Sequence, residues 1–290
     1  MTRSHEVPPG NLQGLERWLT EWASQVEIAP GRLRRRVGIT AIAAMLDGAN
    51  QPTARFIFKG GAAFQFRFGD RARSSADVDL ICRANLVGAM EALEAGLIAG
   101  WSGFTGRLID LGPFDVPGVR IPPQRANAKI SYKGKAFVTI PIEVAAPEGA
   151  SLDRVDRVAI EPISELGLES RMSVPVLGVA YQVAQKIHAC TTIADDGRAN
   201  DRVRDLADLI LLDELAEVEL DHTATACTEI FRLRAMQPWP PDLTVWPHWP
   251  RLWAAIVRDD QFPIADLDVA AELVRSLIVR IDGVIDAGGS

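Results

Sequence analysis

Residues 74–80 constrain the fold most, because two carboxylates lie one residue apart inside an apolar, β-branched run. In an extended strand Asp77 and Asp79 point to one face, while Val78 and Leu80 point to the other. Two like charges side by side on a half-buried strand are costly unless a cation neutralises them, and carboxylate oxygens bind Mg²⁺ well. The stretch therefore predicts a strand that carries a metal site. The alternative is an exposed strand edge that happens to bear two aspartates.

Length and composition set the class of protein. A chain of 290 residues can form one large domain or two modest ones, and about half of its residues are apolar. No apolar run reaches the roughly 18 residues that a membrane-spanning helix needs, and the N-terminus lacks a signal-peptide core. The three cysteines have no C-x-x-C spacing, which argues against a disulfide framework and a zinc cluster. We expect a protein of the reducing cytoplasm without a membrane partner.

The net charge of −7 hides an asymmetry along the chain. Residues 1–135 carry 18 Lys and Arg against 12 Asp and Glu, whereas residues 136–290 carry 13 against 26. A basic half can present a local positive surface to a polyanion such as RNA. The arginines at 32 and 34–36 fit a solvated helix face. Two other basic runs are Arg67, Arg71 and Arg73, which flank the Asp pair, and Arg120, Arg125, Lys129, Lys133 and Lys135.

Hydrophobic periodicity predicts an α/β first half and a helical second half. Expected helices cover about residues 11–26, 31–47, 62–68 and 85–98. Expected strands cover about 55–58, 77–82, 104–110, 126–132 and 136–145, with a hairpin turn at 133–135.

Past Pro147 the pattern changes to a polar connection that runs to about Pro175. Expected helices then cover about 175–192, 201–214, 222–235 and 265–287. The Pro/Trp segment 238–250 is expected to be irregular, and Trp246, Trp249 and Trp253 are expected to cap a hydrophobic core. We expect a first domain at residues 1–150 and a helical domain at 151–290.

Further residues join the Asp pair in a chemical pattern. Gly60-Gly61 lies between a strand and a helix, where backbone can approach an anion closely, and Lys59 can reach a phosphate. The alternative for the glycines is a tight turn. Glu143 is a lone acid among Ile and Val, so it needs a partner, which the aspartates and their metal would supply. Three carboxylates on adjacent strands are used to hold two Mg²⁺ ions for displacement at phosphorus.

Four motifs in sequence order resemble a known family. They are Lys59-Gly60-Gly61, the strand Arg73 to Leu80, the helix Gln182 to Ala189, and the helix Arg202 to Leu209. Together they are similar to the AbiEii/MenT toxins of type IV toxin–antitoxin systems, within the polymerase β-like nucleotidyltransferase superfamily. The resemblance implies an α+β fold: a nucleotidyltransferase domain with a mixed sheet flanked by helices, followed by a mostly helical domain that completes the nucleotide cleft.

The resemblance also implies roles for the C-terminal motifs. Lys186 is expected to hold the triphosphate of an NTP, and Asp208, or else Asp205, to orient it or the base. The two aspartates are three residues apart and share one side of a helix. The alternative for these side chains is a Lys–Asp tie between two packed helices.

The implied function is a Mg²⁺-dependent nucleotidyltransferase toxin that adds NMP from NTP to the 3′ end of tRNA and so blocks aminoacylation. A cognate antitoxin would silence it. Asp77, Asp79 and Glu143 would bind two Mg²⁺ ions. The triphosphate would contact Lys59, Gly60, Gly61, Arg71 or Arg73, Ser75 and Lys186.

Alternatives for the function remain open. One is transfer to a protein hydroxyl or to an aminoglycoside-like small molecule, and another is a non-catalytic nucleotide-binding module. Ser75 lies two residues before Asp77 and is therefore expected beside the triphosphate, where a phosphoryl group would repel the nucleotide. An antitoxin would act by such a modification of Ser75 or by masking the site.

Overall fold

The computed structural model describes residues 4–48, 56–82, 85–114, 121–168, 172–193 and 199–288. Arg55 and Arg120, which the sequence placed in a strand and in a basic run, lie outside the described residues. The chain forms two compact units. The first comprises Met1–Gly69, Ser74–Pro147 and Asp156–Val176, and the second comprises Asp70–Arg73, Glu148–Val155 and Leu177–Ser290.

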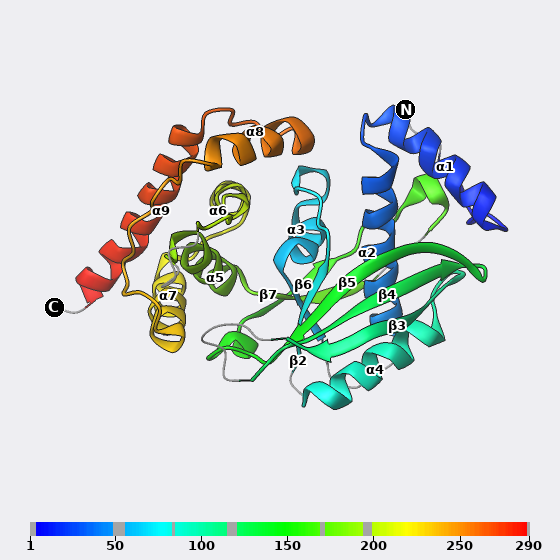
Figure 1. Ribbon diagram of the computed structural model, residues 1–290, viewed down its shortest axis with the longest axis horizontal. Coiled ribbons are helices and arrows are strands. Elements are labelled where there is room, and N and C mark those ends of the chain that lie inside the picture. The colour runs from blue at the N-terminus through cyan, green and yellow to red at the C-terminus, as the bar shows by residue number, and fades with distance from the viewer. Residues whose placement is uncertain are drawn as a thin grey trace. The chain divides into compact units, whose positions relative to one another are not determined.

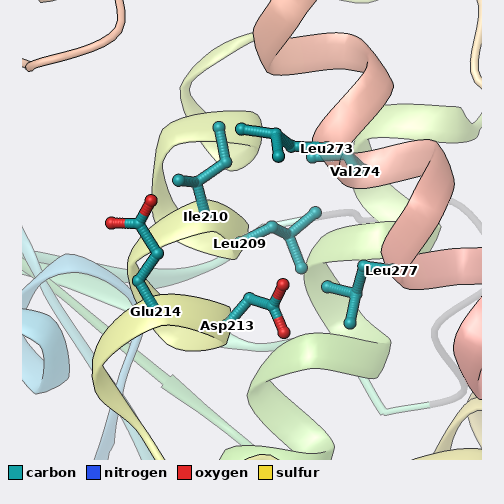
Figure 2. A pocket seen from close by; sticks show the side chains of 7 residues that line it. All are labelled: Leu209, Ile210, Asp213, Glu214, Leu273, Val274 and Leu277. Atoms are coloured by element: carbon teal, nitrogen blue, oxygen red, sulfur yellow. The ribbon is translucent and has the colours of Figure 1, made fainter.

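A mixed sheet is the framework of the first unit (Figure 1). Among the described residues it has seven strands in the order β3-β4-β5-β2-β1-β7-β6. β2 is parallel to β5 and β1 to β7, whereas β1–β2, β3–β4 and β4–β5 are antiparallel. The strands are β1 Phe56–Lys59, β2 Val78–Cys82, β3 Phe104–Pro113, β4 Gln124–Tyr132, β5 Lys135–Ala145, β6 Val155–Ala159 and β7 Ser173–Leu177.

Helices cover one face of this sheet. α2 and α4 pack on each other, with α2 on β5 and α4 on β3 (Figure 1). Val78, Leu80 and Ile142 point inward and are fully buried, and each such side chain contributes roughly 1.5–3 kcal/mol of burial free energy. The helices of this unit are α1 Leu12–Gln25, α2 Pro30–Gly48, α3 Gly60–Phe68 and α4 Leu86–Ala99.

The second unit is mostly helical. α5 packs on α6 and α7, and α9 packs on α6 and α7. Trp249 and Trp253 of α8 are buried, as the sequence predicted for core tryptophans. No helix in the described part of the chain is long and apolar enough to cross a membrane. The helices are α5 Val179–Thr191, α6 Arg204–Leu215, α7 Leu220–Arg234, α8 Trp249–Asp260 and α9 Leu267–Gly288.

The α+β class with a mixed sheet and a helical C-terminal region is thus confirmed, but two segments differ from the prediction. The connection up to Pro175 contains β6 and β7, and Pro175 lies inside β7 instead of opening a helix. The segment predicted to be irregular ends in α8, with Pro250 in its first turn. Proline fits there because the first N–H groups of a helix have no intrahelical partner.

Candidate active site

A row of four polar residues crosses the sheet of the first unit. The strand register places Lys59 opposite Asp79, Asp79 beside Glu143, and Glu143 opposite Arg125. Adjacent strands lie about 4.7–4.9 Å apart, so the four residues are successive neighbours on one face. The row therefore places two carboxylates between two cations.

The alternation predicted for the Asp pair is present. Val78 and Leu80 are fully buried, whereas Asp77 and Asp79 are half-buried. Asp77 lies in the bend just before β2 and not in the strand itself. Ser75 is only 3% exposed, and its hydroxyl donates to the Asp77 carbonyl oxygen at 3.0 Å and lies 3.3 Å from Asp77 Oδ1. Ser75 thus fixes the segment that leads into the carboxylates.

The two glycines let the start of α3 approach this segment. The helix begins at Gly60, two residues before the predicted start, and Gly60 has a φ of 58°. A Cβ atom on Gly60 would lie 2.1 Å from Asp79 Oδ2, and one on Gly61 would lie 2.3 Å from Ser75 Oγ. Any larger residue would therefore displace the carboxylate or the hydroxyl. The first N–H groups of a helix can serve an anion at such a position.

Glu143 pairs with Arg125, a contact that the sequence did not predict. Arg125 Nε donates to Glu143 Oε1 at 3.0 Å, Arg125 Nη2 donates to the same oxygen, and the guanidinium lies 4.1 Å from the Phe114 ring centroid. The Arg125 side chain is 54% exposed and that of Glu143 is 27% exposed. An ion pair this accessible to water contributes only about 0–1 kcal/mol, so a ligand can exchange it readily.

Some of the side chains in this region suit a hard cation. Asp77 and Asp79 offer half-buried carboxylate oxygens, the ligand type that Mg²⁺ prefers. Among the described residues, however, no group of three or more acidic, histidine or cysteine side chains is arranged to hold a metal ion. The two aspartates fit a divalent ion, and Glu143 is engaged with Arg125 instead.

A second polar cluster lies inside the second unit. Lys186 Nζ donates to Asp205 Oδ1 at 2.8 Å and to Asp208 Oδ2 at 2.5 Å, which ties α5 to α6. Arg73 binds Asp208 through both Nε and Nη2, at 2.9 and 2.8 Å. Two cations and two carboxylates balance, so the Lys–Asp tie that the sequence left as an alternative is formed. Arg71 is exposed in a short 3₁₀ turn.

The charges in this cluster stabilise one another. Burial by itself would raise the pKa of Asp208, but Arg73 and Lys186 outweigh it and lower that pKa below its ordinary value. Burial would lower the pKa of Lys186, but Asp205 and Asp208 raise it. Arg73, Lys186 and Asp208 are therefore ionised near neutral pH. Removal of any one leaves an uncompensated buried charge, which is costly.

The comparison with protein families decides the identity. Residues 44–273 match the family model described as "Nucleotidyl transferase AbiEii toxin, Type IV TA system". The chain belongs to the AbiEii family. That match spans more than half of the chain and includes both polar clusters. No curated protein matches the chain.

A solved nucleotidyltransferase structure shares the fold of this chain. MenT4, a nucleotidyltransferase toxin from Mycobacterium tuberculosis H37Rv, superposes with a TM-score of 0.59 at 14% identity, over 92% of this chain and 88% of that chain. An antigenic nucleotidyltransferase-like protein from Paracoccidioides brasiliensis is less similar, with a TM-score of 0.42 at 16% identity over 70% of this chain and 93% of that chain. At this identity the MenT4 likeness shows the fold.

Two contacts of the AbiEii-family site were not predicted from the sequence. One is the Arg125–Glu143 pair, and the other is the bidentate Arg73–Asp208 pair. Arg125 alternates with the buried Ala126 and Ala128 in β4, so its face was readable from the pattern. Its register with Glu143 was not, because the pairing of β4 and β5 depends on a bulge between Ile130 and Ser131.

Proposed function

We propose that this AbiEii-family nucleotidyltransferase toxin transfers a nucleotidyl group from NTP to the 3′ end of tRNA in the cytoplasm, which blocks aminoacylation. The observation that supports the reaction is the polar row of the first unit. It places Lys59 beside Asp79, with Asp77 two residues before Asp79 and a glycine turn at the start of α3. Family membership supports the toxin role.

The residues of the row and those next to it have distinct tasks. Asp77 and Asp79 would hold Mg²⁺, which would supply charge neutralisation at the phosphates and activation of the acceptor hydroxyl. Lys59 and the N–H groups of Gly60 and Gly61 bind the phosphate oxygens. Ser75 holds the Asp77 segment in place. Positioning and charge supply most of the catalysis, because phosphoryl transfer asks for little covalent chemistry from the protein.

The bonds that change are those at the α-phosphorus of the NTP. The 3′ hydroxyl oxygen of the acceptor forms a bond to this phosphorus, the bond to the β-phosphate oxygen breaks, and pyrophosphate leaves. The hydroxyl proton passes to solvent. The chain itself forms no covalent bond.

Arg73 and the Lys186 cluster are also proposed to serve nucleotide binding. Arg73 directly precedes Ser74 in the chain, so a short covalent segment joins it to the Asp77 strand. Because Lys186 donates to Asp208 and Asp208 also accepts from Arg73, we assign Lys186 and Asp208 first to holding Arg73 in place.

The burial of Ser75 favours an antitoxin that masks the active site over one that modifies Ser75. At 3% exposure, with its hydroxyl bonded to Asp77, this serine is reachable for modification only if residues 74–77 open. Mass spectrometry of the toxin co-expressed with its antitoxin tests this point. An unmodified Ser75 in the silenced protein supports masking, and a modified Ser75 overturns it.

Label incorporation tests the reaction and its acceptor. Each of the four labelled NTPs is incubated with the protein and either total RNA or lysate protein. We expect label in tRNA with the wild type. In Asp79→Asn we expect incorporation to fall by at least about a hundredfold, because this change removes a carboxylate charge that supports the transition state. The exposed Asp47 of α2 supplies the matched control Asp47→Asn, which keeps wild-type activity. Full activity of Asp79→Asn contradicts the assignment.

The same assay separates a second acceptor class. Residues 136–290 carry a net charge of −13, which favours a small cationic acceptor or a protein over RNA. Label in protein or in an aminoglycoside, with none in RNA, would keep the chemistry and replace the acceptor. Calorimetry that shows no binding of Mg·NTP would instead indicate a non-catalytic module.

A further inference from the structure

The outer face of β3, β4 and β5 is exposed and polar. On the inner face, Ala126, Ala128 and Ile130 of β4 are completely buried in the core. The alternate residues of the same strands point the other way, and several are exposed to solvent. These are Thr105, Arg107, Arg125, Lys129 and Thr139. In Figure 1 these three strands form the long curved part of the sheet.

Two cations stand directly opposite each other on this face. The register pairs Arg107 of β3 with Lys129 of β4, so that their Cβ atoms are about 4.5–5.5 Å apart. Like charges at such positions destabilise a sheet. Within the described part of the chain, neither side chain makes a hydrogen bond or an ion pair. The pair therefore has an unmet capacity for an anion.

This cationic pair lies on the same face as the polar row of the candidate active site. Lys129 and Arg125 are four residues apart on one strand and share a face, which places them about 14 Å apart along β4. Arg125 lies opposite Glu143, which is the neighbour of Asp79. Thr139 lies opposite Lys129 and adds a hydroxyl donor. An extended chain of phosphates could thus run from Arg107 to the carboxylates.

The charge on these strands also fits a polyanion. Across residues 104–145, the described charged residues are Arg107, Arg125, Lys129, Lys133 and Lys135 against Asp110 and Glu143. This local excess of three positive charges contrasts with the net charge of −7 for the whole chain. Attraction of a phosphate backbone needs such local charge, irrespective of the sign of the whole protein.

We propose that the outer face of β3, β4 and β5 binds the sugar–phosphate backbone of the RNA acceptor, with Arg107 and Lys129 contacting phosphates and leading the 3′ end to the Asp77–Asp79 pair. This inference deepens the proposed function and depends on it for the identity of the acceptor. Contact with this face would not depend on the RNA sequence, because its cations and hydroxyls donate to phosphates and sugars.

Salt dependence of RNA binding tests this assignment. The dissociation constants of tRNA and of a single-stranded 12-nucleotide RNA are measured from 50 to 200 mM salt without NTP. Each lost phosphate contact reduces the slope of log K against log salt by about 0.7 for single strands. Arg107→Gln/Lys129→Gln is therefore expected to reduce the slope for the 12-nucleotide RNA by about 1.4 and to leave Mg·NTP affinity unchanged.

Two control variants make the result specific. Arg17→Gln/Arg157→Gln removes the same charge from exposed positions of α1 and β6 in the same unit, and is expected to keep the wild-type slope. Arg107→Lys/Lys129→Arg preserves both charges and is also expected to keep it. A slope in the Gln double variant that equals the wild-type slope, or a charge-preserving variant that loses as much, overturns the proposal.

Failure of this inference can be told from failure of the proposed function. Binding is measured without turnover, so a reduced slope supports the binding face even if no nucleotide reaches RNA. Transfer to tRNA with an unchanged slope overturns the binding face alone. If the Gln double variant instead loses transfer to a protein acceptor while RNA binding is unchanged, the face binds protein and the proposal is wrong.

Discussion

Gly60 is the residue whose size the candidate site tolerates least. Its φ of 58° costs a non-glycine residue roughly 1–2 kcal/mol, and its Cβ would lie 2.1 Å from Asp79 Oδ2. Gly69 has the matching φ of 57° but open space around it. We predict that Gly60→Ala and Gly69→Ala lose similar stability in thermal unfolding, whereas only Gly60→Ala loses at least about tenfold in nucleotidyl transfer. Equal transfer activities of the two variants would show that nucleotidyl transfer does not depend on the position of Asp79.

His188 makes the stability of the second unit depend on pH. Burial, followed by the charge of Arg234, lowers its pKa to about 4. The unfolded histidine titrates near 6.5, so between these values only the unfolded chain binds the proton. The free energy of unfolding therefore falls as the pH falls from 6.5 towards 4, by about 3 kcal/mol in total.

Urea unfolding between pH 4.5 and 7.5 checks this titration. His188→Phe keeps a ring against Phe231, which now lies 4.9 Å away edge-on, and is expected to flatten the pH dependence. His222 of α7, whose side chain is 42% exposed, supplies the control His222→Asn, which should keep the wild-type profile. A wild-type slope in His188→Phe would assign the titration to another group.

Variants of the Lys186 contacts between α5 and α6 can distinguish a structural role of Lys186 from contact with the substrate. Lys186→Met leaves Asp205 and Asp208 with a single cation, and loss of a buried partner costs about 3–5 kcal/mol. Lys186→Met/Asp205→Asn restores the balance, because Arg73 still pairs with Asp208. We predict that this double variant recovers most of the lost stability in denaturant unfolding.

Activity of the same double variant then decides the role of Lys186. If the lysine only supports Arg73, the double variant regains NTP binding with its stability. A stable double variant that binds NTP at least about tenfold more weakly would mean that Lys186 or Asp205 contacts the nucleotide. That result would contradict the primary assignment to a tie.

Sequence patterns predicted the elements with strong periodicity and missed those that depend on tertiary pairing. The alternation at 77–80 gave β2 to within one residue, and the helices on either side were close to their observed bounds. β7 was missed because its short buried run contains Pro175, which a strand tolerates when few ladder bonds are needed. α8 was missed because prolines dominate the segment before it.

Side-chain pairing across the chain was harder to predict than side-chain type. The sequence identified Glu143 as an acid that needs a partner, but Arg125 became that partner through the register of β4 and β5. It likewise identified Lys186 and Asp208, but not the bidentate bond from Arg73, which is 135 residues away in sequence. Such contacts follow from the folded topology, which local periodicity does not encode.

The molecule as a whole combines an acidic chain with a basic sheet face. The AbiEii family match covers residues 44–273, which include the polar row, the Lys186 cluster and the cationic pair on β3 and β4. In the proposed division of labour, the sheet of the first unit supplies metal, phosphate and acceptor contacts. The helical unit supplies a rigid, charge-balanced support for Arg73.

Manganese binding in the presence of a non-hydrolysable NTP tests the central assignment most directly. Paramagnetic resonance titration is carried out on the wild type and on Asp77→Asn/Asp79→Asn. We predict a Mn·NTP complex on the wild type, and a dissociation constant at least about tenfold higher, or about 1.4 kcal/mol weaker binding, for the double variant. Equal binding by the two proteins would contradict the assignment of the paired aspartates as the metal–nucleotide site.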